Sequence, residues 1–155
     1  MTTTQKTDYK KRLKSQCVDI IQQRIENLKN SMKNAQAAAN QEEKSSAGDK
    51  YETARAMSHM EKDMHAKQLA SNMSELQNLT SVNCDKLYQC AEKGSVVDCE
   101  TILFFIAAGL GKIVFENTIV YLVSPSAPIF KTLKNKTMGE HFSFSNKDYL
   151  INDVY

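Results

Sequence analysis

Four carboxylates gather around Gly48, the one glycine of residues 1–93. They are Glu42, Glu43, Asp49 and Glu52. Carboxylate oxygens are ligands that Mg²⁺ prefers, and the ion usually needs only one or two of them from a given protein. Acidic residues near a helix start can instead offset the helix dipole and keep a turn hydrated. The spacing alone leaves a shared magnesium site and a solvated turn both open.

Methionines follow a near-heptad spacing further along the same half of the chain. They are Met57, Met60, Met64 and Met73. Methionine-rich surfaces can bind varied partners, but this spacing is more typical of the buried seam of a coiled coil. We therefore predict that the methionines pack between helices. The histidines show no partner in the sequence, and we predict that all three are solvated: His59, His65 and His141.

The cysteines are spaced too widely for the usual zinc motifs. They are Cys17, Cys84, Cys90 and Cys99. Structural zinc sites need close CxxC or HxxxH pairs, and no such pair occurs in the sequence. A disulfide framework goes with an export signal, which the polar, lysine-rich segment Met1–Lys14 does not resemble. We predict reduced, packed thiols in a cytoplasmic protein.

The composition is that of a folded chain without a membrane partner. Apolar residues make up 41% and charged residues 25% of the 155 residues, which excludes a disordered tail. The longest apolar run, Ile102–Leu110, is about half of the ~20 residues that a membrane crossing needs. The net charge of +2 is too small to indicate nucleic acid binding. The basic cluster at residues 10–14 is predicted to be a solvated helix start, with a polyanion contact as the alternative.

Glycine and proline divide the chain into two parts. Residues 1–93 contain no proline and one glycine, whereas residues 94–155 contain both prolines and four glycines. Because these residues interrupt helices and mark turns, we predict a helical part over residues 1–93 and a turn-rich domain over residues 94–155.

The helical part is predicted to be an antiparallel coiled-coil hairpin. Its first helix runs from about residue 10 to 40 and carries a seam with a 3.5-residue period. That seam comprises Leu13, Cys17, Ile21, Ile25, Leu28, Met32, Ala35 and Ala39. The second seam begins after Tyr51 with the methionines and continues through Leu69, Leu76 and Leu79. Turn-forming residues between the seams predict a chain reversal with its tip near residues 42–50.

The second part is predicted to be a small β domain. The candidate strands are Ser95–Cys99, Thr101–Ala107, Lys112–Phe115, Thr118–Val123, His141–Ser145 and Tyr149–Val154. Gly109-Leu110-Gly111, Glu116-Asn117 and Ser145-Asn146 are expected to form turns. One short helix is predicted at Ala127–Leu133, with Ser126 as its cap and Pro128 in its first turn. A short helix against a curved antiparallel sheet gives the α+β class.

Two segments resemble the Gre-type transcription elongation factors, which stimulate transcript cleavage. In that family a Ser-Pro-Ile segment and an Ala-Leu-hydrophobic-Gly-Lys stretch lead to Val-Gly-Asp within an FKBP-like domain. The matching places are occupied here by Ala127-Pro128-Ile129, Leu133, Lys136 and Met138-Gly139-Glu140. Asn135 stands where the family usually has glycine. Tyr51-Glu52-Thr53-Ala54-Arg55 resembles the opening of the family's second helix.

The resemblance implies a partner and a mode of binding. An FKBP-like C-terminal domain would bind RNA polymerase at the rim of its secondary channel, and the coiled coil would enter that channel. RNA and DNA would be met only indirectly, within the transcription complex. The implied polymerase-binding residues are Ser126, Pro128, Ile129, Lys136 and Gly139. The chain would have no catalytic residue and no cofactor of its own, and would complete the active site of the polymerase.

The resemblance also assigns a role to the tip carboxylates. Within the polymerase, Glu43 and Asp49 would share a Mg²⁺ ion, because two metals stabilise both the attacking and the leaving oxygen at phosphorus. When the family's tip tyrosine is placed on Tyr51, its essential Asp and Glu fall on Lys44 and Ala47. One alternative is therefore a channel-binding modulator without cleavage activity. Two alternatives from other classes are a coiled-coil adaptor for a non-polymerase partner and a prolyl isomerase that uses the FKBP-like domain.

Overall fold

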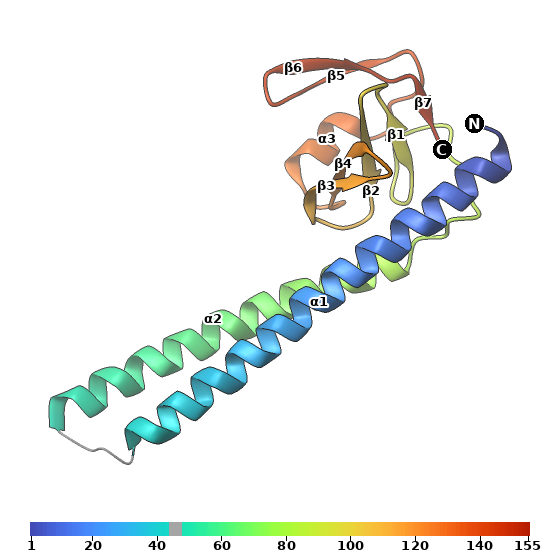
Figure 1. Cartoon of the computed structure of the whole chain (residues 1–155). Coiled ribbons are helices and arrows are strands. Elements are labelled where there is room, and N and C mark those ends of the chain that lie inside the picture. The colour runs from blue at the N-terminus through green and yellow to red at the C-terminus, as the bar shows by residue number, and fades with distance from the viewer. Residues whose placement is uncertain (44–47) are drawn as a thin grey trace. The chain divides into compact units, whose positions relative to one another are not determined.

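The computed structural model describes residues 1–43 and 48–155, and for residues 42, 43 and 48–51 it describes the backbone alone. Two long helices come first, α1 (Thr3–Glu43) and α2 (Gly48–Thr80) (Figure 1). The later elements are β1 (Val96–Asp98), β2 (Ile102–Ile106), β3 (Gly111–Phe115), β4 (Thr118–Val123), α3 (Pro128–Leu133), β5 (His141–Phe144), β6 (Lys147–Leu150) and β7 (Asp153–Val154). The two long helices pack against each other, and the α+β class is confirmed.

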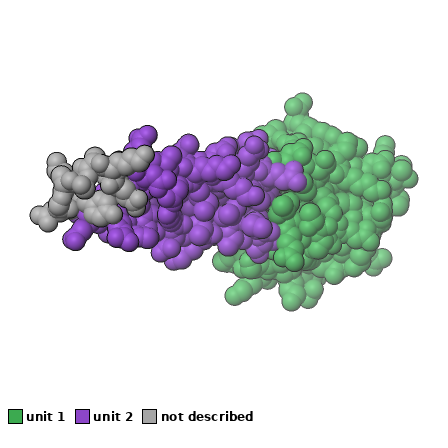
Figure 2. All heavy atoms as spheres, turned by 90° about the horizontal axis from the view of Figure 1, so that it is seen from below, with its two compact units in different colours: residues 1–19, 75–155 green, residues 20–74 purple. Residues whose placement is uncertain are grey.

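Contacts divide the chain into two compact units (Figure 2). Unit 1 comprises residues 1–19 and 75–155, and unit 2 comprises residues 20–74. The first part of α1 and the last part of α2 therefore belong to the same unit as the strands. The domain boundary near residue 94 stays a prediction of the sequence. No helix within residues 1–43 and 48–155 has the length and apolar character that a membrane crossing requires.

Helix α1 begins earlier than predicted because a capping box starts it. The side chain of Gln5 accepts a hydrogen bond from the backbone N–H of Thr2 (2.7 Å), and the Thr2 hydroxyl accepts one from the N–H of Gln5 (3.3 Å). This reciprocal pair satisfies backbone donors that the first turn of a helix leaves free. The predicted start near residue 10 is wrong by about two turns.

The predicted seam of α1 is confirmed. Leu13, Cys17 and Ile21 are buried, and the seam continues as half-buried side chains. Those half-buried residues are Ile25, Leu28, Met32, Ala35 and Ala39. Every one of these positions follows the 3.5-residue period, so the side of α1 that packs could be read from its apolar residues.

The predicted methionine seam of α2 is wrong. Met57, Met60, Met64 and Met73 are 66%, 73%, 50% and 55% exposed. The half-buried positions that recur every three or four residues are instead Ala54, Ser58, Lys62, His65, Leu69 and Asn72. His65 is thus half-buried rather than solvated, whereas His59 and His141 are exposed as predicted. A pair of helices buries only a narrow stripe, so polar side chains at its edge can still reach water.

Lys11 and Arg12 of the basic cluster are exposed as predicted, but Lys10 and Lys14 are not solvated. Lys10 is fully buried: its Nζ donates a 2.8 Å hydrogen bond to the carbonyl of Lys86 and lies 4.4 Å from the centre of the Tyr88 ring. Burial lowers the pKa of Lys10 to about 8. Lys14 donates to the carbonyls of Thr80 and Val82 (2.9 and 2.8 Å), at and just after the end of α2, where a helix leaves carbonyls without a partner inside the helix.

The main sheet has the strand order β3-β4-β2-β1-β7. Its pairs are antiparallel except β2 with β4, which is parallel. β5 and β6 form a separate hairpin. The predicted strand Tyr149–Val154 is wrong as a single element, because its first part is in the hairpin and its last two residues join β1 in the main sheet.

Two of the three predicted turns, Glu116-Asn117 and Ser145-Asn146, are confirmed, and both use left-handed backbone. Glu116 and Asn117 have φ values of 47° and 63°, and Ser145 and Asn146 have 50° and 60°. Two-residue turns of this hand match the twist of the strands that they connect. Gly94 also has a positive φ of 96°, and a Cβ there would lie 2.4 Å from the Tyr88 hydroxyl, so only glycine fits.

Strand β2 is buried on both faces, which explains its unbroken apolar sequence. On one face Phe104 contacts four aromatic rings at centroid distances of 5.2 to 6.0 Å, and they belong to Tyr121, Phe142, Phe144 and Tyr149. On the other face, the start of α1 reaches the sheet through Tyr9, whose ring meets Phe115 edge-on at 5.2 Å. The core of unit 1 thus has three layers.

Helix α3 has Pro128 in its first turn, as predicted, because proline needs no amide partner there; the helix begins at Pro128, one residue later than expected. The predicted cap at Ser126 is wrong: the residue at the cap position is Ala127, which makes no side-chain capping bond. The Ser126 hydroxyl is hydrogen-bonded to the Ser124 hydroxyl (2.9 Å) instead. All four cysteines are free, as predicted, with Cys17, Cys84 and Cys99 buried.

Candidate functional site

The tip carboxylates lie at or near the facing ends of α1 and α2. Glu42 and Glu43 are the last two residues of α1, and Asp49 is the second residue of α2. Their side chains lie outside the described residues, as do Lys44–Ala47, on which the two family tip positions fall. Only four residues join the helices, so their ends are at most about 19 Å apart. Glu52 is described, and it is exposed on α2.

Within the part of the chain that the structure describes, no three His, Cys, Asp or Glu side chains converge in a way that would hold a metal ion. The search does not reach the tip, because the side chains of Glu42, Glu43 and Asp49 are not among those described. A magnesium site at the tip therefore stays a prediction. It would in any case be shared with another molecule, since Mg²⁺ takes few ligands from one protein.

The segment that resembles the Gre-type factors forms a turn, helix α3 and a second turn on the β domain (Figure 1). Ser126 and Pro128 are exposed, and Ile129 is half-buried against the core. The ammonium of Lys136 lies 3.6 Å from a carboxylate oxygen of Glu140. Gly139 is exposed with φ 89°, and its N–H donates to the carbonyl of Ile151 (2.8 Å). Three of these five residues, Ser126, Pro128 and Gly139, are thus exposed, and Ile129 and Lys136 are half-buried.

Backbone hydrogen bonds fix the second half of this segment to the chain before β1. The N–H of Ala91 donates to Lys136, and the N–H of Asn135 donates to Ala91, both at 2.8 Å. Asn135 has φ 65°, in the left-handed region. Asparagine tolerates this region better than most residues, and glycine tolerates it best.

The Thr137–Glu140 turn is closed by a carboxylate. Glu140 accepts hydrogen bonds from the N–H (2.6 Å) and the hydroxyl (3.0 Å) of Thr137. These bonds favour the ionised form and hold the pKa of Glu140 below its usual value. The Glu140 carboxylate therefore has a structural role here, because it stabilises this turn.

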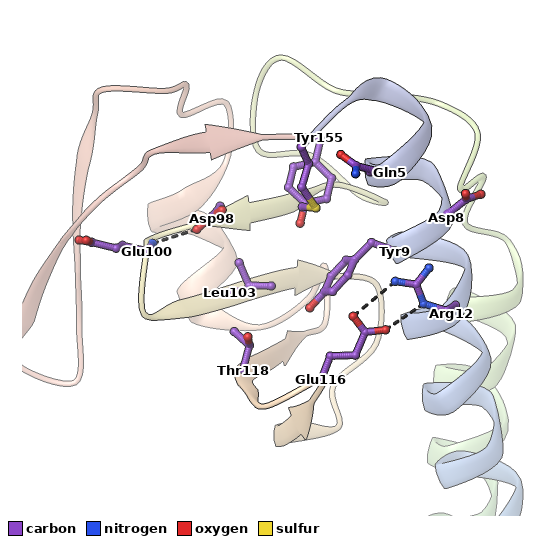
Figure 3. A pocket seen from close by; sticks show the side chains of 11 residues that line it. Gln5, Asp8, Tyr9, Arg12, Asp98, Glu100, Leu103, Glu116, Thr118 and Tyr155 are labelled. Atoms are coloured by element: carbon purple, nitrogen blue, oxygen red, sulfur yellow. Dashed lines mark hydrogen bonds and ion pairs between the residues drawn. The ribbon is translucent and has the colours of Figure 1, made fainter.

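Sequence reasoning missed a pocket of about 440 Å³ in unit 1 (Figure 3). It lies between the first turns of α1 and the strands, and its lining includes Tyr9, Arg12, Asp98, Glu116 and Tyr155. Arg12 donates to both oxygens of Glu116, at 2.8 and 3.4 Å. Tyr9 and Tyr155 are 146 positions apart in the sequence, and no local spacing signals their meeting.

Both tyrosines of the pocket are held in their neutral form. Burial, followed by the nearby carboxylates of Glu116 and Asp98, raises the pKa of Tyr9 to about 12. Burial likewise raises the pKa of Tyr155, with Tyr9 and Asp98 adding to the effect. Two protonated phenols therefore line the pocket at neutral pH.

Comparisons with known proteins add no relative. The chain matches no protein-family model, no curated protein and no solved structure. The resemblance to the Gre-type factors therefore depends on the sequence residues quoted above alone.

Proposed function

We propose that the protein regulates RNA polymerase in the manner of the Gre-type factors. Its β domain would bind the polymerase, and its helical hairpin would enter the secondary channel. The observation that carries the proposal is the presence, in one chain, of an antiparallel hairpin with carboxylates at its turn and a β domain bearing the signature-like segment. Either part alone is common, and their combination in this order is what the family shares.

The hairpin suits insertion into a narrow channel. It consists of two helices, and α2 alone has 33 residues, a length of about 50 Å at the rise of an α-helix. No side chain within residues 22–41 and 52–78 is fully buried. The surface of unit 2 is therefore largely available to a surrounding partner, and its packing needs no third element of this chain.

The β domain suits the binding role. Its signature-like segment holds Ser126 and Pro128 at the surface, while Leu133 of the same segment is fully buried in the core. A rigid core below an exposed turn presents a binding surface without a large loss of entropy on association. We assign the contact with polymerase to this surface, through Ser126, Pro128, Ile129, Lys136 and Gly139.

In the cleavage version of the proposal, the tip supplies ligands rather than a complete active site. Glu43 and Asp49 would bind a Mg²⁺ ion that the polymerase also binds, with Glu42 and Glu52 adding negative charge nearby. This ion would be the second of two in the active site of the polymerase. It would activate water and stabilise the leaving oxygen, and the polymerase would carry out the hydrolysis.

A second candidate function is modulation of the polymerase without cleavage. It is favoured by one specific observation: Lys44 and Ala47 stand at the positions of the family's essential Asp and Glu. Lysine and alanine cannot bind Mg²⁺ at neutral pH. In this version the hairpin would act by occupying the channel.

The test uses purified full-length protein with RNA polymerase in a backtracked complex. Binding is measured by pull-down, and shortening of labelled RNA is measured as Mg²⁺ is varied. The triple variant Glu42→Ala/Glu43→Ala/Asp49→Ala is expected to abolish stimulated cleavage and to retain binding. If the wild type binds and does not cleave, the modulator is the correct version; if the triple variant cleaves normally, the tip mechanism is wrong.

A second pair of variants tests the binding surface. Ser126→Glu/Lys136→Glu places negative charge on the signature-like segment and is expected to weaken polymerase binding at least tenfold. The matched control is Lys147→Glu, which makes a similar change at an exposed position of β6. If the wild-type protein does not bind polymerase at all, the proposal is wrong and the coiled-coil adaptor becomes the favoured function.

A further inference from the structure

The pocket beside the start of α1 has a strongly uneven charge. Four carboxylates line it, from Asp8, Asp98, Glu100 and Glu116, and Arg12 is the one charged nitrogen among its lining side chains. Arg12 is already paired with Glu116. Asp8, Asp98 and Glu100 also belong to the lining, so its carboxylates outnumber its one guanidinium and the lining attracts positive charge.

Unpartnered hydroxyls provide a second, independent observation. Tyr155 is 1% and Tyr9 is 8% exposed, and the hydroxyl of each is buried without a hydrogen-bond partner in the structure. Figure 3 shows both hydroxyls pointing into the pocket, near Leu103 and Asp98. A buried hydroxyl without a partner is unfavourable, so a ligand that supplies a hydrogen bond here would gain affinity.

The walls also contain apolar and aromatic surface. Tyr9, Leu103 and Tyr155 contribute two rings and a branched side chain to the walls, and each is more than nine-tenths buried. Ring faces attract ammonium groups, and methylene chains pack against both kinds of side chain. The structure already shows this preference, because Nζ of Lys6 lies 5.2 Å from the centre of the Tyr155 ring.

We propose that this pocket binds a small aliphatic amine with more than one ammonium group. The carboxylates would pair with the ammonium groups, the tyrosine hydroxyls would accept N–H hydrogen bonds, and the tyrosine rings and Leu103 would pack against the methylenes. The volume of about 440 Å³ lies within the usual range for small-molecule sites. This inference is independent of the proposed function.

Two other classes of ligand fit the pocket less well. An anion such as a phosphate would be repelled by the lining carboxylates. A single metal ion needs several ligands at one point, and none of the described residues form such a group. Carboxylates that are spread around a pocket match separated charges on one flexible chain.

The test is isothermal titration calorimetry of the full-length protein at low ionic strength. The probes are 1,4-diaminobutane, the matched monoamine 1-aminobutane, and succinate as a dianion of similar length. We expect saturable 1:1 binding of the diamine, binding of the monoamine at least tenfold weaker, and no binding of succinate. Absence of saturable diamine binding at millimolar concentration, or equal binding of the three probes, would overturn the proposal.

Three variants locate the site. Glu100→Gln and Asp98→Asn remove one charge each and keep the shape of the side chain, and each is expected to weaken diamine binding about threefold to tenfold. Tyr155→Phe removes only a hydroxyl that has no partner, so the protein keeps its fold, and binding is expected to weaken by a similar factor. The matched control is Asp148→Asn, an exposed carboxylate of β6 outside the pocket, which is expected to leave binding unchanged.

The variants give a clear negative outcome as well. If Asp148→Asn weakens binding as much as Glu100→Gln does, the diamine binds to general negative charge and the proposal is wrong. Unchanged affinity in all three pocket variants leads to the same conclusion. Far-UV circular dichroism of each variant establishes that the fold is retained before the affinities are compared.

Discussion

Helix α1 passes through two different environments, and its two parts show how much packing a helix needs. Residues 3–19 lie in unit 1, where Tyr9, Lys10, Leu13 and Cys17 are buried. Residues 20–43 lie in unit 2, where Ile21 is buried and none of residues 22–41 is fully buried. The first part packs on a sheet of its own unit, and the second part packs on α2 within unit 2. Because burial supplies most of the stability of a helix in a protein, we infer that unit 1 is the stable unit and that unit 2 opens more readily.

The largest expected effect comes from the core of unit 1. Phe104→Ala removes a fully buried ring that contacts four others, and we expect a loss of about 3–5 kcal/mol in the free energy of unfolding. Leu28→Ala, at a half-buried position of unit 2, is expected to cost about 1 kcal/mol. Urea denaturation followed by circular dichroism measures both. Equal losses would contradict the difference between the units.

Alkaline pH should weaken unit 1 through its buried thiols. Burial raises the pKa of Cys17 from 9.0 to about 12, so the folded state keeps its proton when the unfolded state has lost it. The unfolded state therefore binds fewer protons between pH 9 and 12, and stability falls as the pH rises through this window. By pH 11 we expect a loss of about 2–3 kcal/mol from this group.

The variant Cys17→Ala isolates that contribution. It should be less stable than the wild type at pH 7, because a packed side chain is lost, and the difference should shrink or reverse at pH 11. Urea denaturation at both pH values gives the two differences. A difference that stays the same at pH 7 and pH 11 would show that Cys17 does not titrate in this way.

Replacing a polar residue in the packed stripe of α2 should raise the free energy of unfolding. The Nδ1 atom of His65 is buried and has no hydrogen-bond partner among the described residues. His65→Leu removes that atom and adds apolar contact with α1, so we expect a gain of about 1–2 kcal/mol in the free energy of unfolding. Met60→Gln, at an exposed position, should change it by less than about 0.5 kcal/mol. If Met60→Gln changed the free energy of unfolding more than His65→Leu does, the methionines would be the packed residues, as the sequence predicts.

Two lysines of α1 give the smallest and most direct comparison. Lys6, in unit 1, pairs with Asp153 at 2.5 Å and lies over the Tyr155 ring. Lys33, in unit 2, is exposed. Lys6→Met is expected to lower the free energy of unfolding by about 1 kcal/mol, and Lys33→Met should have little effect. A double-mutant cycle with Asp153→Asn separates the ion pair from the ring contact, and a coupling of zero would rule the ion pair out as a cause.

Local patterns predicted much of the fold because short-range physics governs them. The 3.5-residue period of Leu13, Cys17 and Ile21 found the packed face of α1. Glu116-Asn117 and Ser145-Asn146 were expected turns, and both have the left-handed backbone that such turns need. The unbroken apolar sequence of β2 placed it correctly as a strand.

The candidate site was predicted unevenly for the same reason. Carboxylates beside a turn are visible in the sequence, so Glu43 and Asp49 could be placed at the ends of helices, although their side chains lie outside the described residues. The surface segment from Ser126 to Gly139 was found through resemblance. The pocket could not be found, because it joins residues from both ends of the chain.

The sequence by itself determined where helices and turns occur, which side of α1 is apolar, and that the chain has a helical and a β-rich part. Only the tertiary structure decided which side of α2 packs, because that choice depends on the partner helix and not on the methionines of α2. It also buried Lys10 and split Tyr149–Val154 between two sheets. Finally, it brought Tyr9 and Tyr155 into one pocket. Such outcomes depend on contacts between residues that are distant in the chain, and no local period or propensity encodes them.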